Sequence, residues 1–203
     1  MNNVTVNKSI RLSQHFTLGE MTRTGTGIPN IPSRVSIENL RNICENWLEE
    51  MRRRYNERYV FEEGGRRFFE EGGRFFEEGG RRKEEGEYSK GREETEEAEE
   101  TEEAEETEEA EEPIVITSGY RSPEVNRAVG GSPTSNHLSG CAVDIRCAGF
   151  EQAVRYASIL LDIADDTGQD YDELFIERKK AVRYWLHFAV RPEGNRRKNG
   201  FLL

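Results

Sequence analysis

The chain has 203 residues, a formal net charge of −11 and a hydrophobic fraction of 34%. This length suits one domain with an appendage. No run approaches the roughly 20 apolar residues that a membrane-spanning helix needs, so we expect no membrane span. The charge is uneven: residues 57–112 contain 24 Glu and 9 Lys or Arg, whereas the rest of the chain contains 20 basic and 16 acidic residues. The part expected to fold is therefore mildly basic, which is too weak a balance to identify an anionic partner.

The start of the chain and its cysteines give little sign of export. Residues 1–14 are polar and lack the apolar core of a signal peptide. Cys44, Cys141 and Cys147 form an odd set without a CxxC pair, which predicts neither a disulfide framework nor a cysteine zinc cluster. We expect a chain made in the cytoplasm, which another factor would have to release or export to reach a substrate outside the membrane.

The first quarter predicts an arm followed by a helix. Residues 1–31 read as an irregular arm with apolar residues that can pack onto the body, and His15 within it is expected to be a surface or packing residue. A helix is predicted over residues 36–55, because apolar residues recur there every three or four positions. Ser33 or Ser36 can cap it. Residues 1–56 are therefore assigned to the domain as its arm and first helix.

Residues 57–112 are of low complexity. A Phe-Glu-Glu-Gly-Gly-Arg unit recurs from Phe61, Phe69 and Phe76, and Thr-Glu-Glu-Ala-Glu-Glu occurs three times in tandem over residues 95–112. Such tracts cannot bury enough apolar surface to fold, so we expect a disordered insert. The alternatives are an acidic tract that binds a partner and an RNA-binding segment, but the acidic excess argues against nucleic acid.

Residues 113–203 are expected to form the second half of the domain. Periodicity and turn residues predict strands over 114–117, 141–147, 173–177 and 183–190, helices over 122–129 and 150–164, and a loop-like basic tail from 191. The fold class is α+β: a small, mostly antiparallel sheet with helices packed on one side, interrupted by the insert.

Three residues in this half could bind a metal ion: His137, Asp144 and His187. Catalytic zinc sites use three protein ligands and leave a fourth position open. Because side chains alternate along a strand, Asp144 is expected on the face opposite Cys141 and Cys147, which would belong to the core. By spacing alone, a structural histidine in an apolar strand remains the simpler interpretation.

Three motifs follow one another along the chain: Ser118-Gly119-Tyr120-Arg121-Ser122, Ser135-x-His137-x-x-Gly140-x-Ala142-x-Asp144 and Trp185-Leu186-His187. In this order they resemble the M15 zinc peptidases. This family includes D-Ala-D-Ala carboxypeptidases, dipeptidases and phage endolysins, and it shares its fold with the hedgehog signalling domain. The resemblance also takes in residues 16–21 and the helix ending near Tyr55. It covers about residues 10–55 and 113–197 and leaves the insert outside.

The resemblance implies Zn²⁺ bound by His137, Asp144 and His187. It also implies that Arg121 holds the scissile carbonyl oxygen or a substrate carboxylate, and that Ser135 braces the site through hydrogen bonds. The implied activity is hydrolysis of peptidoglycan stem-peptide or cross-link bonds. Separately, we expect a monomer with no nucleic-acid partner.

The proton-transfer residue departs from part of the family. Many members place an acid or a histidine two or three residues before the last zinc histidine, where this chain has Trp185 and Tyr184. Other members have a glutamate at the end of the preceding strand, and Glu177 matches that placement. If the final hairpin pairs residues whose numbers sum to 360, Glu177 opposes Arg183 and Glu173 opposes His187, and either carboxylate can face the metal.

Glu177 is the favoured base, and the alternative is an exposed edge glutamate paired with Arg183 or a neighbouring lysine. The missing acid beside His187 also keeps a second interpretation open. In that case the chain is a non-catalytic, zinc-stabilised module that binds the cell wall or a protein.

Overall fold

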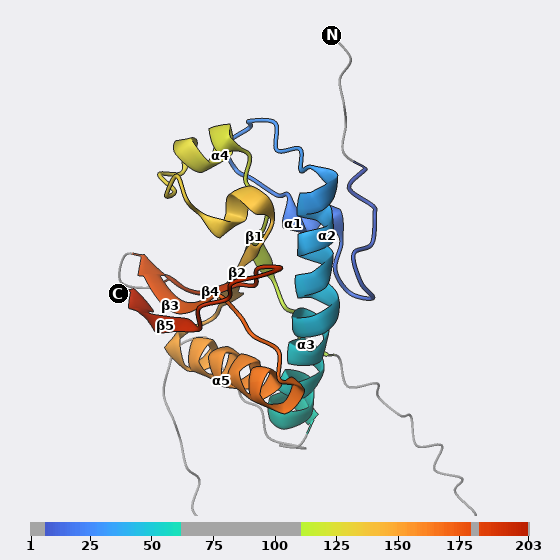
Figure 1. Cartoon of the computed structure of the whole chain (residues 1–203). Helices are drawn as coiled ribbons and strands as arrows, with labels where there is room; N and C mark the ends of the chain where they lie inside the picture. The colour runs from blue at the N-terminus through green and yellow to red at the C-terminus, as the bar shows by residue number, and fades with distance from the viewer. Residues whose placement is uncertain (1–6, 62–110, 180–182, 203) are drawn as a thin grey trace, which may run out of the picture.

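The computed structural model describes residues 7–61, 111–179 and 183–202 and shows an α+β domain built on one sheet (Figure 1). The sheet order is β1-β2-β4-β3-β5. The strands are β1 (Ile116–Ser118), β2 (Ala142–Cys147), β3 (Glu173–Lys179), β4 (Arg183–Ala189) and β5 (Lys198–Leu202). Only β3 and β5 pair in parallel among these neighbours, which confirms the expected small, mostly antiparallel sheet.

The first long helix is longer than its pattern indicated. It runs without a break through α2 (Arg34–Ile43), the π-helical η1 (Cys44–Leu48), α3 (Glu49–Asn56) and the π-helical η2 (Glu57–Phe61). Of the two candidate caps, Ser33 takes the position, accepting a hydrogen bond from the Ser36 N–H. The helix extends past residue 55 because Tyr59 and Val60 still pack against the core. The first residues assigned to the insert therefore belong to the helix.

The arm is less irregular than expected. A single helical turn, α1 (Leu18–Met21), begins at Thr17, whose hydroxyl and backbone N–H exchange hydrogen bonds with Glu20 in a capping box. Four apolar side chains of the arm are buried in the main core; they are Leu12, Phe16, Leu18 and Met21.

The chain before and after the low-complexity stretch meets at one asparagine. Asn56 accepts a hydrogen bond from the Glu112 N–H at 2.7 Å and donates one to the Glu112 carbonyl at 3.2 Å. The later turns of the helix therefore lie beside the start of the segment leading to β1. The predicted disorder falls mainly on residues 62–110, which lie outside the described residues.

The second half adds three helical segments: α4 (Pro123–Ala128), the 3₁₀ turn η3 (Asn136–Ser139) and α5 (Phe150–Thr167). In Figure 1, α5 lies below the sheet and α4 above it, while α2 and α3 stand at one side. The face of the sheet toward α5 is apolar and buried, with Val143, Ile145, Leu174, Ile176, Leu186 and Phe188. The core is completed by Trp47, whose ring centroid lies 5.0 Å from that of Phe188. The opposite face carries the polar side chains of Asp144 and His187, beside the aromatic rings of Phe175 and Trp185.

The prediction of a loop-like tail was wrong. Residues 198–202 form β5, which pairs in parallel with β3. Arg196, just before β5, makes two hydrogen bonds of 2.6 Å to the fully buried carboxylate of Asp172. This ion pair places the tail against the start of β3. A strand held by such a contact needs no apolar alternation of its own, so its sequence resembles a loop.

Gly140, which ends η3, provides a test of how closely η3 packs on α2. Its φ is +72°, and a Cβ there would clash with the Ser36 carbonyl oxygen, whereas Gly168 has a φ of +69° and open space around it. Gly168→Ala should cost about 1–2 kcal/mol, the strain of an L-residue in the left-handed region. Gly140→Ala should cost clearly more, because the backbone clash adds to the same strain. Urea unfolding of both variants measures the difference, and equal losses would contradict the close approach.

Candidate metal centre and active site

The polar face of the sheet brings two of the three metal-ligand candidates side by side. Asp144 on β2 and His187 on β4 are direct partners across the antiparallel pair. His137 approaches from η3. Asp144 Oδ1 lies 3.2 Å from His137 Nε2 and 2.9 Å from His187 Nδ1. One donor atom from each residue lies within 4.8 Å of the other two, and all three side chains are almost fully buried. The structure therefore places the three residues together.

The ring orientations follow from the outer partners of the histidines. His137 Nδ1 lies 2.5 Å from the Gly119 carbonyl oxygen. A carbonyl only accepts, so Nδ1 carries a proton, and Nε2 is the ring nitrogen turned toward Asp144. His187 Nε2 lies 3.5 Å from Glu173 Oε2, and its Nδ1 faces Asp144. Both rings thus have an outward carbonyl or carboxylate partner, the arrangement that orients metal-binding histidines in proteins.

The electrostatics of the cluster favour a cation at its centre. Burial alone would raise the pKa of the Asp144 carboxyl, but the charges and hydrogen bonds of His137 and His187 hold it well below its usual range. Burial alone would lower the pKa of His187, but hydrogen bonds to Asp144 and Glu173 raise it to about 9. Two imidazole nitrogens and a carboxylate oxygen that converge in a buried place need a proton or a metal ion between them. This donor set fits a metal ion.

Arg121 lies against the same aspartate. Its Nη2 donates to Asp144 Oδ2, and its Nε donates to Ser118 Oγ at 2.8 Å. Its backbone N–H donates to the His137 carbonyl at 3.0 Å. The guanidinium is therefore fixed beside the metal candidates and remains partly exposed.

The two candidate carboxylates share the polar face, but the predicted hairpin register was wrong by two residues. Glu177 pairs with Trp185, and Glu173 pairs with Ala189, while Phe175 stands opposite His187. A shift of two keeps side-chain parity, so both glutamates still point to the His187 side of the sheet.

Their surroundings separate the two glutamates. Glu173 is hydrogen-bonded by His187 and Asn136 and ion-paired with Arg196, and these hydrogen bonds, with that of His187 the strongest, lower its pKa. Glu177 is half-buried, and burial raises the pKa of its carboxyl. Glu173 is thus held as a hydrogen-bond partner of His187, whereas Glu177 is held as a desolvated carboxylate.

Ser135 and its neighbour Asn136 lie beside the cluster. Ser135 Oγ accepts the His137 backbone N–H at 3.4 Å and caps η3. Asn136 donates to Asp172 at 2.7 Å and to Glu173 at 2.9 Å, so it links the turn carrying His137 to the carboxylate that contacts His187. The sequence did not single out Asn136 or Asp172, because an asparagine before a histidine carries no signal of a contact 36 residues away.

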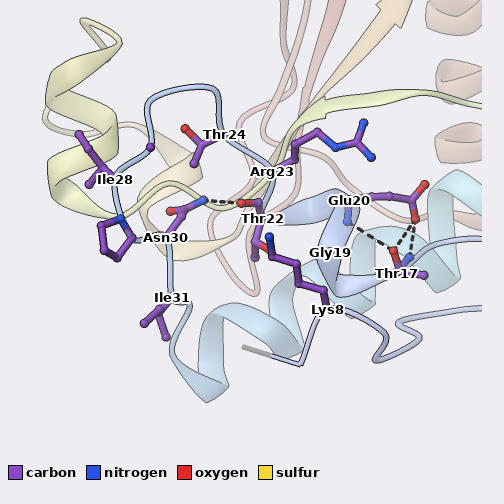
Figure 2. A pocket seen from close by; sticks show the side chains of 12 residues that line it. Lys8, Thr17, Gly19, Glu20, Thr22, Arg23, Thr24, Ile28, Asn30 and Ile31 are labelled. Atoms are coloured by element: carbon purple, nitrogen blue, oxygen red, sulfur yellow. Dashed lines mark hydrogen bonds between the residues drawn. The ribbon is translucent and has the colours of Figure 1, made fainter. Parts of the chain in front are cut away.

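The described residues also form hollows that none of the three ligand candidates lines. One of about 660 Å³ is formed by the arm and contains none of the three ligand candidates; Lys8, Glu20 and Arg23 lie around it with Asn30 and Ile31 (Figure 2). Another of about 640 Å³ is bordered by Ser135, Asn136 and Arg191. The convergence of donor atoms, not the size of a hollow, identifies the candidate site.

The cysteines lie outside this cluster, as strand parity predicted for Cys141 and Cys147. All three are free and buried. Burial raises the pKa of the Cys44 and Cys141 thiols, and that of Cys147 to about 12. Because the thiolate is the reactive form, native protein at pH 8 should react very slowly with Ellman's reagent and release three equivalents on unfolding. Fast release of one equivalent from native protein would contradict this burial.

His15 is part of the arm and binds Glu49, with its Nδ1 2.6 Å from the carboxylate, away from the metal candidates. Among the residues that the structure describes, no helix combines the length and apolar character needed to cross a bilayer.

The comparisons with known proteins support the resemblance drawn from the motifs. The sequence profile of the family described as Peptidase M15 matches residues 80–171. The matched stretch contains Arg121, Ser135, His137 and Asp144 and ends before the strands that carry the remaining candidates. No curated protein gives a significant match. The profile match supports membership of the peptidase M15 family, and the α+β fold agrees with the fold that the resemblance implied.

Proposed function

We propose that this chain is a zinc-dependent peptidase that hydrolyses stem-peptide or cross-link bonds of peptidoglycan, as a D-Ala-D-Ala carboxypeptidase or an endolysin. The observation that carries the proposal is the convergence of His137, Asp144 and His187 in a chain that matches the profile of a peptidase family. The substrate class is the one that the motif resemblance implies.

The proposed ligands are His137 through Nε2, Asp144 through Oδ1 and His187 through Nδ1, since these atoms face one another. When bound there, a zinc ion supplies Lewis acidity toward water and toward a peptide carbonyl. Gly119 and Glu173 hold the two imidazole rings through the nitrogens turned outward.

Arg121 is proposed to bind the oxygen on which negative charge develops during hydrolysis, or a substrate carboxylate. A guanidinium held by Asp144 and Ser118 is already oriented before substrate arrives. Preorganised donors of this kind stabilise the transition state because they need not reorient during the reaction. Ser135 is proposed to brace this arrangement by holding η3 at its first turn.

Glu177 is proposed as the general base, which takes a proton from the attacking water and returns it to the leaving amine. Burial raises its pKa above the usual carboxyl value, so it is a stronger base than an exposed glutamate. Glu173 is less suited, because its carboxylate is already bound by His187, Asn136 and Arg196. It is proposed instead to orient His187.

One pair of measurements tests the proposal: zinc titration of the purified chain, and turnover of purified muropeptides with and without a chelator. We expect one zinc ion per chain, and cleavage that stops on chelation and returns when zinc is added back. Zinc binding without cleavage would favour the non-catalytic binding module, which the replacement of the usual acid by Tyr184 or Trp185 leaves open. Absence of zinc binding would refute both.

A further inference from the structure

Asn30, in the loop after α1, joins the arm to the segment that carries Arg121. Its Nδ2 group donates to the Thr22 carbonyl at 3.0 Å and to the Tyr120 carbonyl at 2.8 Å, so both of its N–H groups are used. Its Oδ1 accepts the Ser122 backbone N–H at 2.7 Å. Figure 2 shows the Asn30 amide pointing at the Thr22 carbonyl on the wall of the arm hollow.

Two of the three hydrogen bonds of Asn30 go to the residues on either side of Arg121. Tyr120 precedes Arg121 and Ser122 follows it, so Asn30 holds the peptide groups on both sides of Arg121. The Tyr120 N–H also donates to the Met21 carbonyl at 2.8 Å, which adds a second tie to the arm. The backbone at Arg121 is therefore fixed by groups more than 90 residues away in the sequence.

This same segment makes two contacts with the metal candidates. The Gly119 carbonyl accepts the hydrogen bond from His137 Nδ1, and the Arg121 guanidinium donates to Asp144. A shift of the segment would loosen the His137 ring and move the guanidinium together. The bonds of Asn30 thus bear on two functional groups while its side chain touches neither.

A second asparagine makes the same kind of clamp far from these groups. Asn56 donates to the Arg52 and Glu112 carbonyls and accepts the Glu112 N–H. It too spans a long sequence separation with two donated bonds and one accepted bond. The segment that it fixes contains no candidate site residue, so Asn56 serves as a matched control for a purely structural clamp.

We propose that Asn30 is a positioning residue of the active site, which sets the Gly119 carbonyl for His137 and the backbone of Arg121 for substrate. The inference rests on the proposed function for its catalytic part. Its structural part, the placement of the His137 ring, can be measured without zinc.

The experiment compares Asn30→Ala with Asn56→Ala in the full chain. Three quantities are measured. Zinc affinity comes from chelator competition, and kcat and KM come from turnover of a muropeptide. The rate at which the His137 Nδ1 proton exchanges with water is measured by NMR on zinc-free protein. Loss of an outer partner of a metal-binding histidine typically weakens metal binding or activity about 10–100-fold. For Asn30→Ala we expect weaker zinc binding of that order, a lower kcat with a smaller change in KM, and faster exchange of the Nδ1 proton.

Asn56→Ala should lower the melting temperature and leave zinc affinity, kcat and the exchange rate as in the wild type. If Asn30→Ala does not fold, Asn30→Asp replaces it. That variant keeps the acceptor for Ser122 but places a carboxylate against two carbonyl oxygens, so we expect the same three changes.

The proposal is overturned if Asn30→Ala and Asn56→Ala lower the melting temperature to a similar degree and both leave zinc affinity, kcat and the His137 Nδ1 exchange rate unchanged. If the wild type binds no zinc, the proposed function fails, and the His137 exchange rate alone then decides the inference. An unchanged rate in Asn30→Ala would overturn it.

Discussion

Replacement of Asp144 by alanine or asparagine is expected to abolish both zinc binding and peptide cleavage. Asp144 Oδ1 faces both His137 and His187, and its Oδ2 accepts from Arg121, so it is the common contact of the whole cluster. Without its charge, two imidazoles alone are left to hold the ion. The loss should exceed the roughly 10–100-fold cost of removing an outer partner of a metal ligand. Metal content after dialysis and turnover on muropeptides measure it.

The control for this prediction is Asp162→Ala. Asp162 is a partly exposed aspartate on α5 that pairs with Arg58 at 2.7 Å, and surface pairs of this kind contribute at most about 1 kcal/mol. It should keep full zinc content and activity. His137→Ala should behave like Asp144→Ala. Full metal content and activity in both site variants would show that the site is misplaced.

Replacement of Glu177 by glutamine is expected to lower kcat about 10²–10⁴-fold, the usual contribution of a general base, while zinc content stays at one per chain. Glutamine keeps the size of the side chain and its place on β3 opposite Trp185, but cannot take a proton from water. The measurement is kcat at saturating substrate together with metal content. Loss of the metal instead would show that Glu177 supports the zinc site.

Glu173→Gln is the matched comparison, because it makes the same change four residues earlier on the same face of β3. Glu173 contacts His187 Nε2, so we expect weaker zinc affinity and a smaller loss of kcat once zinc is saturating. The opposite pattern, with turnover lost at Glu173 and kept at Glu177, would assign the base to Glu173.

Local patterns in the sequence were enough to predict most helices and strands, and the strand face on which Asp144 lies. The apolar repeat over residues 36–55 predicted the first helix, and alternation over residues 141–147 placed Asp144 on the face opposite the two cysteines. Both signals are local, because a helix or strand repeats its own periodicity within a few residues. The motifs around His137 and Asp144 likewise lie within one stretch, and the family profile covers that stretch.

What the sequence determined by itself, then, was the α+β class, the family resemblance and the residues eligible to bind a metal. Tertiary structure alone decided which of them meet: Asp144 pairs with His187 across 43 residues, and Glu173, not Glu177, contacts that histidine. Two further features appear only in the tertiary structure: the pairing of β5 with β3, and the hydrogen bonds from Asn30 to the residues on either side of Arg121. These features depend on pairing register and on backbone hydrogen bonds between distant segments. Neither leaves a periodic trace in the chain, because a carbonyl or N–H partner is the same chemical group at almost every residue.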